Sequence, residues 1–233
     1  MSILSVNKIR CLSLGFPMLD DVFPGFELGD FAVLQGNAAS FMSSVLSVRA
    51  QLLHEYGGLE SSTVFVDGGN SFSSYEVAET ARDYSLDCRA ALEKVYVSRA
   101  FTAFQFSSLI LEKLYSVLKK TKSRLLIVSD ITALFLDRDM PKTEGRELFM
   151  KVCSKLSEIV SERQVIIICS YFPGGRRVQG LFFEAVLFGK CNVLIKVRKR
   201  GQILKIALED HPHIRPFSVD FTADQPSDYV LEA

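Results

Sequence analysis

The sequence lacks several features that would decide its class at once. It has no net charge, because 27 basic and 27 acidic side chains balance, so the chain as a whole is not drawn toward nucleic acid or an anionic membrane. No apolar run approaches the roughly 20 residues that span a bilayer, and no small-residue cleavage site follows the amino terminus. We therefore expect a cytoplasmic protein with no membrane partner.

Cysteine and histidine are too few and too scattered to build a metal centre. The five cysteines stand apart and form no C-x-x-C pair, which argues against a zinc site and for free thiols in a reducing compartment. His211 and His213 have the spacing of neighbouring metal ligands, but no third ligand lies near them in the sequence. We predict no metal site.

What the chain does have is an alternation of short apolar runs and longer segments of helical period. The runs predict strands buried on both faces, at residues 31–36, 63–67, 95–98, 125–130 and 164–170. Helices are predicted between them, at about 41–56, 74–93, 103–121 and 143–162. This order predicts an α/β fold with a mostly parallel, twisted sheet flanked by helices.

The last quarter of the chain has a different pattern. Apolar and polar residues alternate on both sides of "KRGQ", which predicts an antiparallel hairpin, and "FSVDF" predicts one more strand. We expect a single domain over residues 1–233, because no linker or internal repeat divides the chain. Residues 222–233 are polar and acidic, and they predict a flexible tail.

The stretch "VLQGNAASFMSSVL" has the outline of a phosphate-binding turn. A Walker A loop follows G-x-x-x-x-G-K-[ST], in which glycines let amides surround phosphate, the lysine neutralises it and the hydroxyl holds magnesium. Here Phe41 stands at the second glycine, Met42 at the lysine and Ser43 at the hydroxyl. The groups that remain form a vestigial cofactor-binding set of Gly36, Ser40, Ser43 and Ser44.

Segments along the whole chain resemble the RecA/RadA recombinase superfamily. "LSLGFPMLDDVFPGFELGDFAVLQG" is similar to the family's opening segment, "TVFVDGGNSF" to its "Y-I-D-T-E-x-x-F" strand end, and "RLLIVSDITALFLD" to its Walker B stretch. The likeness covers about residues 12–222 and is nearest in size to the short archaeal RadB paralogues. It implies a RecA-like, P-loop NTPase-like core.

The chain departs from this pattern at the catalytic positions. Gly69 replaces the glutamate that orients the attacking water, and Ser129 stands at the Walker B aspartate, with Asp130 one residue late. Because strand side chains alternate, Asp130 does not inherit the metal-facing direction unless the strand bulges or ends there. Ser170 and Tyr171 replace a pair that senses the γ-phosphate. We predict a pseudo-ATPase with no catalytic residue and no cofactor; bound ATP with magnesium is the alternative.

In the family that the chain resembles, two loops contact single-stranded DNA. Here they correspond to residues 136–148 and 171–183, and the second is the stronger candidate. Its Arg176 and Arg177 could neutralise phosphates, and its aromatic residues Tyr171, Phe172, Phe182 and Phe183 could stack on bases. A basic cluster at the predicted hairpin adds Lys199 and Arg200 to the candidate DNA-binding residues, although a solvated hairpin tip explains it equally well.

Three functions remain open. The first is a non-catalytic RecA/RadA-like paralogue that assists DNA recombination or repair by binding DNA, a recombinase or both. The second is an ATP-binding ATPase with substituted catalytic residues, and the third is a KaiC-like interaction adaptor with no DNA role. Only about a dozen residues precede the core. We therefore expect self-association or pairing with a recombinase, and no long filament built through the family's amino-terminal tether.

Overall fold

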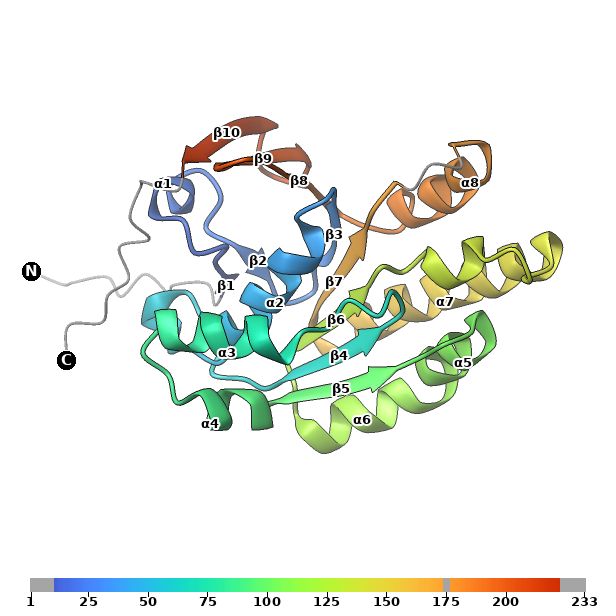
Figure 1. Ribbon diagram of the computed structural model, residues 1–233, viewed down its shortest axis with the longest axis horizontal. Coiled ribbons are helices and arrows are strands. Elements are labelled where there is room, and N and C mark those ends of the chain that lie inside the picture. The colour runs from blue at the N-terminus through green and yellow to red at the C-terminus, as the bar shows by residue number, and fades with distance from the viewer. Residues whose placement is uncertain (1–10, 174–176, 223–233) are drawn as a thin grey trace, which may run out of the picture.

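The computed structural model describes residues 11–173 and 177–222, with the side chains of 177–179 excepted. An eight-stranded sheet runs through its centre in the order β10-β9-β8-β3-β7-β6-β4-β5 (Figure 1). The strands are β3 (Phe31–Gln35), β4 (Thr63–Asp67), β5 (Val95–Arg99), β6 (Leu125–Ser129), β7 (Ile166–Tyr171), β8 (Val193–Arg200), β9 (Ile203–Asp210) and β10 (Phe217–Thr222). All pairs from β8 to β5 are parallel, so the predicted sheet is confirmed.

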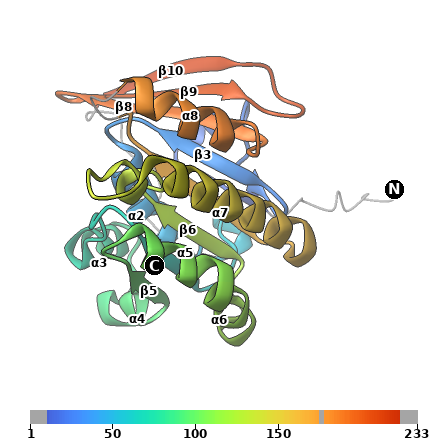
Figure 2. The same ribbon diagram turned by 90° about the vertical axis from the view of Figure 1, so that its right-hand side faces the viewer.

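Helices cover both faces of this sheet (Figure 2). One face carries α2 (Ala39–Arg49), α3 (Ser74–Asp83) and α4 (Cys88–Glu93). The other carries α5 (Ala103–Ser108), α6 (Leu114–Thr121), α7 (Lys142–Arg163) and α8 (Arg177–Phe188), with a π-helical segment, Leu109–Lys113, joining α5 to α6. Smaller elements are α1 (Pro17–Asp20), the paired strands β1 (Cys11–Leu12) and β2 (Phe26–Glu27), and 3-10 turns at His54–Tyr56 and Ala133–Leu136.

β3, β4, β6 and β7 are continuously apolar because each of them packs on both layers of helices. β5, which was also predicted to be buried on both faces, is mostly exposed, because it lies at the edge of the sheet. Along β3, Ala32 and Leu34 join the core under α2, whereas Phe31 and Val33 join the core under α7. Side chains that alternate in this way must be apolar at every position. The continuous apolar runs that predicted these buried strands therefore reflect the helices that cover both faces of the sheet.

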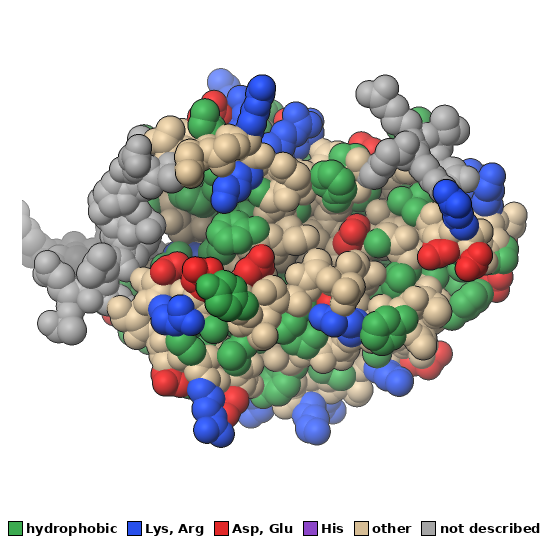
Figure 3. All heavy atoms as spheres, in the orientation of Figure 1, with side chains coloured by type: hydrophobic (Ala, Val, Ile, Leu, Met, Phe, Trp, Pro, Cys, Tyr) green, Lys and Arg blue, Asp and Glu red, His purple; other side chains and the backbone are tan. Residues whose placement is uncertain are grey.

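The predicted hairpin is confirmed. β8 and β9 pair antiparallel, and β10 pairs antiparallel with β9. Lys and Arg side chains gather at the top of the molecule, where these strands lie (Figure 3). The hairpin thus extends the parallel sheet by two antiparallel strands and presents a basic surface.

Two local predictions were wrong. Most of the segment predicted as a Gly-rich loop after β7 forms α8, which begins at Arg177. The helix predicted over 74–93 is two helices, each with its own cap: Ser73 Oγ accepts from the Glu76 amide and Asp87 Oδ1 from the Ala90 amide. Ser85 turns the chain between them with a φ of 55°. The second cap was readable in "SLDCRAA", since aspartate is a strong N-cap residue.

The parallel strands bring four segments of the chain to one edge of the sheet. The carboxyl ends of β3, β4, β6 and β7 point the same way, toward the side where α7 begins (Figure 1). Ligands of open α/β sheets bind at this edge.

Within the described residues no helix is long and apolar enough to cross a membrane.

Candidate functional site

Hydrogen bonds join the turn between β3 and α2 to β7 and β8. The amide of Gly36 donates to the Tyr171 carbonyl at 3.0 Å, and the amide of Ala38 donates to the Val197 carbonyl at 3.3 Å. Gly36 has a φ of 133°, and a β-carbon there would lie 2.2 Å from the Val197 carbonyl oxygen, so only glycine fits. The side chain of Asn37 adds two hydrogen bonds of 2.9 Å with the backbone of Lys199.

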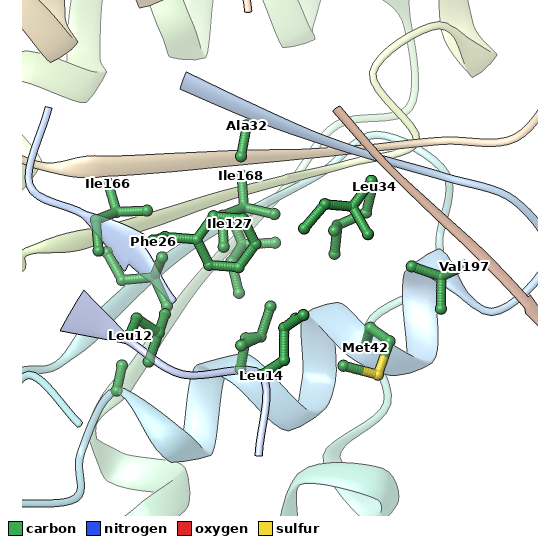
Figure 4. Close-up of a cluster of buried hydrophobic side chains, with 14 of the residues drawn as sticks. Leu12, Leu14, Phe26, Ala32, Leu34, Met42, Ile127, Ile166, Ile168 and Val197 are labelled. Atoms are coloured by element: carbon green, nitrogen blue, oxygen red, sulfur yellow. The ribbon is translucent and has the colours of Figure 1, made fainter. Parts of the chain in front are cut away.

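Met42, at the lysine position of the pattern, lies in the hydrophobic core. Its side chain is 1% exposed and points into the cluster that holds Leu14, Leu34 and Val197 (Figure 4). A side chain in this position faces the underside of the sheet and not the turn. The side chain at this position therefore packs in the core and carries no charge.

The serine hydroxyls of the vestigial set bond within the protein. Ser43 is fully buried, and its Oγ donates to the Ala39 carbonyl at 2.9 Å. Ser44 Oγ donates to Glu76 Oε2 at 2.8 Å and lies 3.4 Å from the Ser40 carbonyl. Of the predicted set, Gly36 lies at the turn and Ser40 in the first turn of α2, whereas Ser43 and Ser44 are buried on the inner side of α2.

Basic residues of β8 lie beside this turn. Phe41 is 44% exposed, and Lys199 Nζ lies 6.0 Å from the centroid of its ring. The side chain of Arg198 also approaches Gly36, with its Cγ 3.4 Å from where a β-carbon would stand. The sequence placed these cations on a distant hairpin. No local signal could have linked them to the turn, because the pairing of β3 with β8 joins segments about 160 residues apart.

A buried carboxylate organises the end of β4. Asp67 is fully buried, and four donors reach its two oxygens: the amides of Ser71 and Phe72, Ser129 Oγ at 2.8 Å and Arg99 Nε at 2.9 Å. Burial acts to raise the pKa of Asp67, but these hydrogen bonds and the Arg99 charge outweigh it and hold the pKa below its usual value. The hydroxyl of Ser129, at the predicted Walker B position, thus donates a hydrogen bond to Asp67.

Asp130 lies against Gly69, the position predicted to lack the family's glutamate. β6 ends at Ser129, and Asp130 has a φ of 43°, so the alternation of the strand no longer sets its direction. A β-carbon at Gly69 would lie 2.5 Å from Asp130 Cβ and 3.0 Å from its Oδ2. Glycine at 69 therefore leaves the room that Asp130 occupies, a contact that the sequence did not reveal.

The environment of Asp130 disfavours its charge. Burial, and then the negative charge of Asp67, raise the pKa of Asp130 to about 6. Among the described residues its backbone amide is bonded, to Ser170 Oγ at 2.8 Å, but its carboxylate enters no ion pair. Among the described residues, the Asp67 carboxylate thus accepts hydrogen bonds from several donors, whereas the carboxylate of its neighbour Asp130 has no cationic partner.

The aromatic residues predicted to stack on bases divide into two groups. Tyr171 is buried and donates to Glu184, and burial followed by the Glu184 charge raises its pKa to about 12. Phe183 is buried in a cluster with Phe135 and Phe149. Phe172 is exposed and Phe182 is half-buried. Only the last two remain available for stacking.

A pocket of about 310 Å³ joins the two loops predicted to bind DNA. Phe135, Asp137, Met140, Pro141 and Phe183 line it together with three cations, Arg138, Lys142 and Arg146. The Arg146 guanidinium carbon lies 4.9 Å from the ring centroid of Phe182. Sequence reasoning did not single out these cations, although Lys142 and Arg146, four residues apart, were a signal that they share one face of a helix.

The other predicted DNA-binding residues are placed in part. Arg176 lies outside the described residues, and Arg177 opens α8 with a side chain that is not described. Lys199 and Arg200 are exposed at the end of β8. Two cations of the same basic cluster are neutralised: Lys196 pairs with Glu209 at 3.0 Å and Lys205 with Asp220 at 3.4 Å. The hairpin therefore carries fewer unpaired positive charges than its sequence suggests.

Comparison with known proteins gives the family. A family model described as Rad51 matches residues 9–170. The chain belongs to the Rad51 family. It is 29% identical over 139 residues to the DNA repair and recombination protein RadA of Aeropyrum pernix, an alignment that covers 58% of this chain and 43% of that protein. The chain thus spans less than half the length of this Rad51-family relative.

The match confirms the resemblance to the RecA/RadA superfamily and the RecA-like fold. The part of the chain that matches the Rad51 model contains the β3–α2 turn, Asp67 and Asp130, so the substituted positions lie inside the family region. The loop after β7 and the basic hairpin lie beyond it. A nearer likeness to RadB paralogues stays a prediction.

Proposed function

We propose that this Rad51-family protein assists DNA recombination or repair without hydrolysing ATP, by binding single-stranded DNA and a recombinase. The RadA relative is named for DNA repair and recombination, which supports the general role. The observation that carries the proposal is the pocket lined by Arg138, Lys142 and Arg146, the last of which lies over the ring of Phe182.

The chemistry of this pocket suits a single strand. Cations neutralise phosphates and release counterions, and an aromatic ring accepts a base whatever its sequence. Arg146 already lies over one face of Phe182, which leaves the exposed Phe172 as the freer platform. Arg176 and Arg177, which the sequence predicted to bind DNA, remain candidate phosphate contacts in our proposal.

The absence of hydrolysis is supported by the β3–α2 turn. Phosphoryl transfer depends on groups that neutralise charge and position water. The lysine position is buried as Met42, and Ser43 is bonded to Ala39. Each missing electrostatic group of this kind costs about 3 kcal/mol of barrier stabilisation, so turnover should be lost.

The recombinase partner is supported by β5, which ends the sheet and pairs only with β4 among the described strands. Tyr96 and Val97 on this edge strand are exposed, and Phe101 and Phe104 continue the apolar surface beyond it. An uncovered apolar edge invites an added strand from another chain. We infer that a segment of a recombinase, or of a second copy, pairs here.

The test is single-stranded DNA binding by fluorescence anisotropy over a range of salt. We expect the double variant Lys142→Ala, Arg146→Ala to bind about tenfold more weakly, with a salt slope smaller by about 1.4, because two phosphate contacts with a single strand are lost. Lys151→Ala is the matched control, since Lys151 is an exposed cation of the same helix outside the pocket. Equal binding by all three proteins would reject the DNA interface.

A nucleotide-binding ATPase with substituted groups is the second candidate, and two observations favour it. Lys199 stands beside the turn and could replace the missing lysine, and the Asp130 carboxylate occupies the place of the missing glutamate. Titration with ATP and magnesium separates the two, since a nucleotide that binds the folded state raises its melting temperature. A protein that binds neither DNA nor nucleotide but captures a recombinase would fit the adaptor alternative.

A further inference from the structure

A second basic surface lies at the opposite, amino-terminal edge of the sheet. A cavity of about 380 Å³ opens where α6 and α7 end and where β6 and β7 begin. Four cations line it: Lys119, Lys122, Arg124 and Arg163. The remaining lining residues are Leu28, Leu118, Ser123, Gln164 and Val165, so none of those described is acidic.

The two arginines form the fixed part of this surface. Arg163 is half-buried, and its guanidinium carbon lies 3.7 Å from the ring centroid of Tyr115. Arg124 is half-buried, and its backbone is held on both sides, with its amide donating to Ser61 Oγ at 2.8 Å and its carbonyl accepting from Ile166 at 2.8 Å. Lys119 and Lys122 are exposed at the rim.

The four positive charges exceed the negative dipole charge at the helix ends beside them. Two helix carboxyl termini meet here, and each carries about half a negative charge, so together they balance about one cation. Four cations line the cavity, and within the described part of the chain none of them forms an ion pair. A surplus of about three positive charges remains for an external anion.

We propose that this surface binds the phosphodiester backbone of duplex DNA. The cations come from α6, from the connection to β6 and from α7, so they form a spread surface that suits a line of phosphates. None of the described residues that line the cavity is aromatic, so the surface offers no stacking platform for unpaired bases. A duplex offers its phosphates without unstacking, so binding here is independent of sequence.

The surface is distinct from the pocket proposed for single-stranded DNA. The strands between the two edges have five or six residues, which corresponds to about 17–20 Å. The protein can therefore hold a single strand at the carboxyl edge and a duplex at the amino edge together. The inference does not rest on the proposed function, because it uses other residues and another ligand.

The test compares variants of the full chain in anisotropy titrations with a labelled duplex. Lys119→Gln, Lys122→Gln changes only rim side chains, and we expect it to weaken duplex binding about tenfold and to reduce the salt slope by about 2. Lys113→Gln, Lys151→Gln is the control, since both are exposed cations on the same helical layer outside either pocket. Circular dichroism checks that all the variants fold.

The outcomes separate the two proposals. The amino-edge variant should leave single-strand binding unchanged, and Lys142→Ala, Arg146→Ala should leave duplex binding unchanged. Duplex binding that is equal in the wild-type, amino-edge and control proteins overturns the inference. Oligoglutamate that competes as well as the duplex, and loses affinity in the same variant, would assign the surface to an acidic peptide and also overturn it.

Discussion

Two neighbouring parts of the carboxyl edge differ in whether they hold a buried charge. On the side of β4 and β6, the Asp67 carboxylate stays charged in the interior because two amides, Ser129 and Arg99 donate to it. On the side of β3 and α2, the lysine position is Met42, and its side chain is part of the core. Charge persists where the chain itself supplies the partner, and it is absent where a bound phosphate would have had to supply it.

Restoring the charge on the uncharged side gives the largest expected effect. Met42→Lys should lower the free energy of unfolding by roughly 3–5 kcal/mol, because it leaves a cation without a partner among Leu14, Leu34 and Val197. Denaturant unfolding measures the loss. Met42→Leu is the control and should cost less than about 1.5 kcal/mol. A stable Met42→Lys protein that hydrolyses ATP would show that the turn still holds phosphate.

Weakening the charged side should have the next largest effect. Asp67→Asn keeps the shape but turns a donor toward groups that already donate, so we expect a loss of roughly 2–3 kcal/mol. Urea unfolding of Asp67→Asn and of Ser129→Ala, which removes one donor only, gives the graded comparison. An Asp67→Asn protein as stable as the wild type would mean that the carboxylate network contributes nothing.

Asp130 gives the smallest effect and the one that depends on pH. Its folded-state pKa of about 6 lies above the ordinary value of 3.8, so the folded state holds the proton more tightly and stability falls as the pH rises from about 4 to 6. Above that window the penalty is fully present. Asp130→Asn should therefore stabilise the protein at pH 7.5 by roughly 1–2 kcal/mol, after allowance for partial exposure.

Thermal unfolding at pH 7.5 and at pH 4 tests this prediction. Asparagine tolerates the left-handed backbone of position 130, so the change isolates the charge. A gain of equal size at both pH values would point to packing against Gly69 and not to the carboxylate. A loss at pH 7.5 would mean that the charge has a partner.

Much of the fold followed from the sequence, because its signals are local. Continuous apolar runs predicted β3 to β7, and alternation across "KRGQ" predicted β8 and β9. The helix α8 was missed because its start follows a run of glycines and arginines that is typical of a loop. The break between α3 and α4 was missed because a single residue, Ser85, turns the chain.

The candidate sites depended on contacts that no local pattern carries. The resemblance to the family pattern predicted that the lysine, glutamate and aspartate positions hold Met42, Gly69 and Ser129. Only the tertiary structure placed Met42 in the core, Asp130 against Gly69 and Lys199 beside Phe41. The sequence determines which chemical group stands at each position. The burial of that group, its pKa and the partner of its charge depend on segments that come together only when the strands of the sheet pair.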